Sequence, residues 1–67
     1  MSRRRYPKPA REIVLDFLRS VGRPVGLGEI VKSTGIAYNT VRGRLYELKK
    51  KGLVKRTSDG WVEVNAP

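Results

Sequence analysis

The sequence predicts a small α+β domain in which three helices and a short strand precede a C-terminal two-stranded hairpin. Apolar residues recur at helical spacing in three segments between residues 10 and 51. Beyond residue 52 they alternate or cluster as in strands, on either side of Ser58-Asp59-Gly60, a strong hairpin signal. A chain of 67 residues has room for one such domain with a modest core. We therefore expect one folded unit at residues 10–67.

The N-terminal residues differ from this unit in composition. Met1 to Pro9 holds Arg3, Arg4, Arg5 and Lys8 with two prolines and no apolar periodicity, which predicts a basic, flexible arm over residues 1–9. Such an arm can follow a DNA backbone or enter a minor groove, where negative potential is concentrated. A solubilising tail without a binding role explains the same residues equally well.

Two helices and a short strand are predicted next. The first helix begins near Ala10 and ends at Gly22, and the second begins around residues 26–28 and ends at Gly35, where a left-handed residue is needed. Between them, Val25 is expected to pair as a one- or two-residue strand with the later hairpin. The inward residues are Ala10, Ile13, Val14, Phe17, Leu18 and Val21 in the first helix and Leu27, Ile30 and Val31 in the second.

The third helix, at about 37–51, has the most informative pattern. An apolar stripe is predicted to face the core, and the opposite surface is then free to contact a partner. Arginine binds phosphates or pairs with guanine, and asparagine pairs with adenine. A glycine in the middle of a helix lets another backbone approach closely. The stripe is Ile36, Val41, Leu45 and Leu48, and the outward residues are Asn39, Arg42, Gly43, Tyr46 and Lys50, flanked by Tyr38, Thr40, Arg44, Glu47 and Lys49. The segment indicates a nucleic-acid recognition helix.

Residues 49–51 are all lysines, and their charge suits the negative C-terminal end of this helix. Helix capping and phosphate contact are compatible interpretations of that run.

The hairpin strands are expected at residues 53–57 and 61–64. Leu53 and Trp61 should cover the helices together with either Val62 or Val64, and Trp61 is interpreted as a core anchor rather than a base-stacking platform. Since Asp59 in the turn would repel phosphate, the hairpin is expected to brace the fold and to touch a nucleic-acid backbone through Arg56.

The amino-acid composition limits the kinds of function that the chain can have. Fifteen Lys and Arg against 6 Asp and Glu give a net charge of +9, which favours a polyanionic partner. Cysteine and histidine are absent, so the sequence offers no disulfide, no thiolate nucleophile and none of the usual zinc or imidazole sites. The acidic residues are scattered singly. We expect no enzyme, cofactor, small-molecule ligand or membrane segment, and a cytoplasmic, nucleoid-associated location.

The stretch VGLGEIVKSTGIAYNTVRGRLYELKKKGLVKR, from Val25 to Arg56, resembles the core of winged helix-turn-helix transcriptional regulators. That family combines a short apolar strand, a T/S-G-I/L turn, a helix opening with S-x-x-T-V and a closing G-L-V. Two positions depart from the pattern. Ala37 stands where a capping Ser or Thr is usual, which weakens the helix start by about 1 kcal/mol. Gly43 stands where a larger polar residue is common.

The resemblance implies sequence-specific binding of double-stranded DNA, with the third helix in the major groove. It also implies a homodimer on inverted repeats. A winged-helix module that docks RNA or a protein of the transcription or translation machinery, and a non-specific architectural DNA-binding protein, remain alternatives. The candidate contacts are Asn39, Arg42 and Tyr46 to bases, Thr40, Arg44, Lys49, Lys50 and Arg56 to phosphates, Tyr38 to DNA, and Arg3, Arg4 and Arg5 to the minor groove or backbone.

Overall fold

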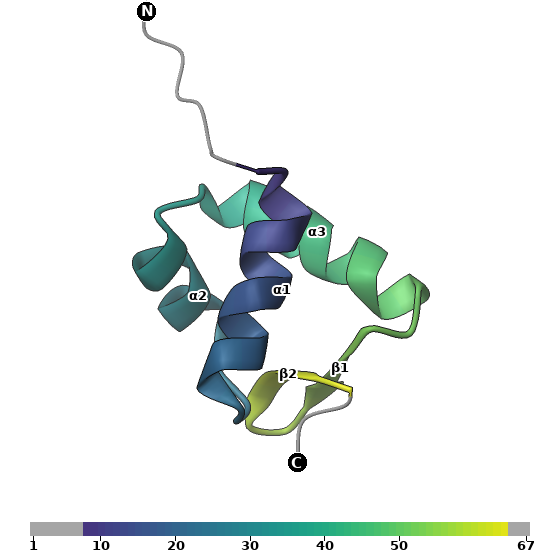
Figure 1. Ribbon diagram of the computed structural model, residues 1–67. Coiled ribbons are helices and arrows are strands. Elements are labelled where there is room, and N and C mark those ends of the chain that lie inside the picture. The colour runs from purple at the N-terminus through teal and green to yellow at the C-terminus, as the bar shows by residue number, and fades with distance from the viewer. Residues whose placement is uncertain (1–7, 65–67) are drawn as a thin grey trace, which may run out of the picture.

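The computed structural model describes residues 8–64 and confirms the predicted α+β fold (Figure 1). The helix α1 packs across α3, and the hairpin lies near the C-terminal end of α1 (Figure 1). Arg3, Arg4 and Arg5 lie outside the described residues, as does most of the predicted arm. The elements are α1 Ala10–Val21, α2 Leu27–Thr34, α3 Tyr38–Lys50, β1 Val54–Thr57 and β2 Gly60–Glu63.

The turn between α2 and α3 is built on Gly35. Its φ of 74° is left-handed, and its N–H donates to the Val31 carbonyl at 2.9 Å, which closes α2. Ile36 then turns inward and is only 1% exposed, as predicted. The helix α3 starts after Ala37, and no side-chain hydrogen bond caps it.

One apolar core joins all five elements. Val41 and Leu45 of α3 are fully buried and Leu48 is 2% exposed, so the predicted stripe faces the core. Val14 and Leu18 of α1 and Ile30 of α2 are also fully buried, and Val25, Ile36, Val54 and Trp61 complete the cluster. Because the stripe points inward, the opposite surface of α3 faces solvent.

The hairpin is antiparallel, and Val25 pairs with β2 through an isolated β-bridge. Val25 donates to the Trp61 carbonyl at 2.9 Å and accepts from the Trp61 N–H at 2.7 Å, which confirms the predicted pairing. Gly60 makes this contact possible. A Cβ there would lie 2.3 Å from the Val25 carbonyl oxygen, and its φ of 134° also disfavours any side chain.

One hairpin prediction is wrong. Leu53 was expected to cover the helices, but its side chain is 38% exposed, whereas Val54 is 2% exposed. The reason is strand phase: β1 begins at Val54, and a shift of one residue exchanges the two faces of a strand. Of the alternatives considered for β2, Val62 is buried and Val64 is 42% exposed.

Candidate nucleic-acid interface

The outward surface of α3 carries most of the predicted contact residues side by side. Tyr38 is 54% exposed and Tyr46 is 45% exposed, so both aromatic rings are accessible to a partner. The polar members of the set lie along the same helix: Asn39, Arg42, Lys49 and Lys50 are exposed, and Thr40 and Arg44 are partly exposed. The fold thus assembles one continuous polar and aromatic surface from residues 38–50.

A groove of about 670 Å³ separates this surface from the hairpin. Tyr38, Arg42 and Tyr46 line the helix side, at successive turns of α3, and Arg56 lines the hairpin side. The groove also includes the turn residues Thr57 to Gly60. Two guanidinium groups from elements apart in sequence therefore border the same open groove, and Asp59 is the one acidic residue among the described residues that line it.

Trp61 packs against Tyr46. The two rings meet edge to face, with centroids 6.0 Å apart and planes at 87°. Trp61 is 7% exposed and belongs to the core cluster, as predicted. The ring of Tyr46 is thus held by packing on one side and open to solvent on the other.

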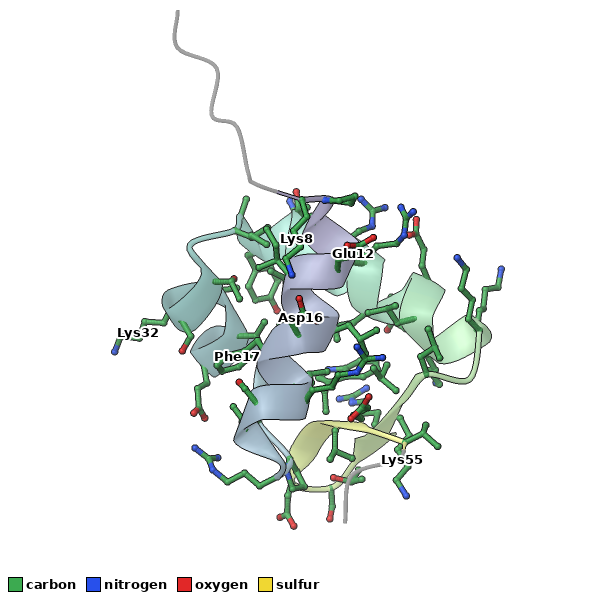
Figure 2. All side chains as sticks on the ribbon, viewed as in Figure 1. Lys8, Glu12, Asp16, Phe17, Lys32 and Lys55 are labelled. Atoms are coloured by element: carbon green, nitrogen blue, oxygen red, sulfur yellow. The ribbon has the colours of Figure 1, made fainter. Side chains whose placement is uncertain are left out.

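Ion pairs are concentrated on α1 and α2. Lys8 pairs with Asp16, and Arg19 reaches both Asp16, at 3.7 Å, and Glu63, at 2.6 Å. Figure 2 shows Lys8 directly above Asp16 on the exposed side of α1. A further pair joins Arg23 to Glu29 at 2.9 Å.

These pairs shift pKa values in the expected directions. The hydrogen bond from Lys8 lowers the pKa of the Asp16 carboxyl and raises the pKa of Lys8. The hydrogen bond to Glu63 raises the pKa of Arg19. On this side of the molecule Lys8, Arg19 and Arg23 thus each have an acidic partner, whereas Arg11 and Lys32 have none among residues 8–64.

The basic residues of α3 and the hairpin are mostly free. Among residues 8–64, the cations without an acidic partner are Arg11, Lys32, Arg42, Lys49, Lys50, Lys51, Lys55 and Arg56. Apart from Arg11 and Lys32, all of these belong to α3, its C-terminal end or β1. Figure 2 shows the Lys55 side chain extending from the hairpin into solvent. Lys51 and Lys55 were not among the predicted contacts, although the lysine run and the strand charge pointed to both.

Arg44 is the exception on α3. Its guanidinium donates to both carboxylate oxygens of Glu47, at 3.0 and 2.7 Å. A bidentate pair of this kind has strong directional preference, so a phosphate would have to compete with Glu47 for the same donors. Arg44 is therefore less free to bind phosphate than the other predicted residues.

In the range 8–64 no group of His, Cys, Asp and Glu side chains is arranged to hold a metal ion. None of the helices described here has the length and apolar character needed to cross a bilayer.

Comparison with protein families gave one finding. The family model for the IclR helix-turn-helix domain matches residues 14–58, which run from within α1 to the first residue of the hairpin turn. Comparisons with curated proteins and with solved structures gave no match. The matched span includes the whole of α3 and every predicted contact outside the N-terminal arm.

Proposed function

Since the chain belongs to the IclR helix-turn-helix domain family, a winged helix-turn-helix family of DNA-binding transcriptional regulators, we propose that α3 enters the major groove of double-stranded DNA and reads its sequence. One observation carries the proposal: unpaired cations are concentrated on α3 and the hairpin. Contacts to phosphate dominate the affinity of proteins for DNA, and a cation already paired with a carboxylate contributes less to them. The surface with free cations is therefore the one that best fits the duplex.

The base contacts are assigned to Arg42, Asn39 and Tyr46. Arg42 is exposed and, within residues 8–64, has no carboxylate partner, so both edges of its guanidinium are free to pair with guanine. Asn39 lies nearly one turn earlier on the same exposed surface and suits adenine. Tyr46 offers a hydroxyl on a ring that Trp61 supports.

The phosphate contacts are assigned around these residues. Arg56 borders the groove opposite Arg42, so a DNA strand running between α3 and the hairpin would meet both. Lys51 and Lys55 join the set because they are exposed and unpaired among the described residues. The remaining proposed contacts are Thr40, Arg44, Lys49 and Lys50 to phosphates, Tyr38 to the duplex, and Arg3, Arg4 and Arg5 to the minor groove or backbone.

Two further proposals follow from the function. A regulator of this kind acts on the nucleoid in the cytoplasm, and a homodimer would present two copies of α3 to an inverted repeat with half-sites about one helical turn apart. Analytical ultracentrifugation of the free protein and of its complex with a single half-site tests the dimer. A monomer in both samples would rule it out.

The function is tested by fluorescence anisotropy with three probes: a random-sequence duplex, a single strand and a structured RNA. Each titration is repeated across a salt series, and tight sites are then selected from a random duplex pool. We expect a recovered consensus that binds roughly 10³-fold or more tighter than random duplex.

Each of the other outcomes would indicate a different function for the protein. Salt-sensitive duplex binding without a consensus would make it an architectural DNA-binding protein. A preference for RNA would make the basic surface an RNA-docking site. No binding to any of the three probes would leave the fold without a nucleic-acid role and overturn the proposal.

A further inference from the structure

Gly43 lies near the middle of α3 and serves no purpose inside the described fold. It is partly exposed, and a Cβ built on it meets no described atom within 4 Å beyond its two chain neighbours and the nearby backbone of its own helix. Glycine inside a helix is nevertheless less favourable than alanine by about 1 kcal/mol. The chain therefore keeps a destabilising residue at a position where its own packing would accept a side chain.

Gly60 and Gly35 differ from Gly43 in this respect. Gly60 is required because a Cβ would collide with the Val25 carbonyl, and Gly35 is required because its φ is 74°. Gly43 has neither a close neighbour nor a positive φ. Gly28 in α2 is a second helical glycine whose Cβ would meet nothing, but it lies in the first turn of its helix.

The position of Gly43 on α3 forms a notch in the exposed surface. Residues three and four apart on a helix are surface neighbours, with Cβ atoms about 5–6 Å apart. Asn39, Tyr46 and Glu47 stand at those offsets from Gly43, and all are exposed. The side chains of these residues thus surround a point on α3 at which no side chain covers the backbone.

We infer that Gly43 is the point at which the α3 backbone comes closest to the base edges of the duplex, and that the missing side chain sets how deeply α3 enters the major groove. The inference rests on the proposed function. A helix with its side chains is about 10–12 Å across and the major groove is about 12 Å wide, so a helix fits with little room to spare. A side chain on the leading surface would hold the backbone away from the bases and lengthen the contacts of Arg42 and Asn39.

The test is a series at this position, Gly43→Ala and Gly43→Gln, with Gly28→Ala as the matched control. Both alanine variants add a Cβ to open space on a helix, so both should fold and neither should lower the melting temperature. For the selected consensus duplex, we expect Gly43→Ala to raise Kd about 10-fold and Gly43→Gln to raise it further. Kd for random duplex and the salt dependence should stay close to wild type, because the phosphate contacts are retained.

Each other result has a defined meaning. If the wild type reads a consensus and Gly43→Ala binds it with unchanged Kd, the inference is wrong and the proposed function stands. The same holds if Gly43→Gln binds more tightly, or if Gly28→Ala weakens binding as much as Gly43→Ala. If the wild type selects no consensus duplex, the proposed function and the inference fall together.

Discussion

The surface of α1 and α2 and the surface of α3 and the hairpin are both rich in charge, but their cations have different partners. Around α1 and α2, Lys8, Arg19 and Arg23 each pair with a carboxylate of the same chain, whereas Arg11 and Lys32 have no such partner among the described residues. On α3 and the hairpin, Arg44 alone among the described residues has such a partner. The net charge of +9 is a property of the whole chain, but the part of it that is free to bind a polyanion belongs mainly to one side. The number of charged residues in the sequence would not have distinguished the two surfaces.

The largest expected effect comes from the residue that joins the two regions. Trp61 pairs with Val25, belongs to the core and supports Tyr46, so Trp61→Ala should lower the free energy of unfolding by about 3–5 kcal/mol. Urea unfolding followed by circular dichroism measures this. The control is Leu53→Ala on the same hairpin, whose side chain is 38% exposed and should contribute much less, about 1 kcal/mol. Similar losses in the two variants would mean that the hairpin buries a different face.

The next largest effect is a loss of duplex affinity that we expect for Arg42→Ala and not for Arg11→Ala. Both are exposed arginines without an acidic partner among residues 8–64, but Arg42 lies on α3 and Arg11 on α1. Arg42→Ala should weaken binding to the consensus duplex by about 1–3 kcal/mol and binding to random duplex much less. Arg11→Ala removes the same charge and should change neither. Anisotropy titrations measure all four affinities. Equal losses of Arg42→Ala on both duplexes would assign Arg42 to phosphate instead of a base.

A smaller effect is expected for the lysines. Lys50→Ala should weaken binding to all duplexes alike and reduce the slope of log K against log salt by roughly one, because one phosphate contact is lost. Lys32→Ala, on α2, should leave the slope unchanged. Figure 2 shows the Lys32 side chain extending away from α2 into solvent. If the two variants changed the slope equally, the division of the molecule into two charged surfaces would be wrong for binding.

The smallest effect concerns an ion pair on α1. Because Lys8 lowers the pKa of the Asp16 carboxyl in the folded state, this pair stabilises the fold above the unfolded pKa of about 4 and ceases to do so as the pH falls through the folded value. Asp16→Asn should therefore be slightly less stable than wild type at pH 7, and the difference should disappear at low pH. Urea midpoints at both pH values measure it. Duplex affinity at neutral pH should not fall.

Much of the helical part of the domain could be predicted because helix geometry is local. The spacing of Val41, Leu45 and Leu48 determines which side of α3 is buried, and that in turn exposes Asn39 and Arg42. Gly35 and Ile36 similarly identified the turn between α2 and α3. The buried face of β1 was harder to predict. Leu53 and Val54 are adjacent, and both are apolar. Which of them is buried depends on the residue at which pairing with β2 begins.

The sequence by itself determined the helix order, the buried side of α3 and the positive charge, because residues a few positions apart meet within one element whatever surrounds it. Tertiary structure decided which cations are free, since Arg19 meets Glu63 only where the hairpin returns to α1. It also brought Arg56 to the groove beside Arg42, and Trp61 to the ring of Tyr46. It left Gly43 facing empty space, because the helices and the hairpin that could have filled that space pack against the other side of α3.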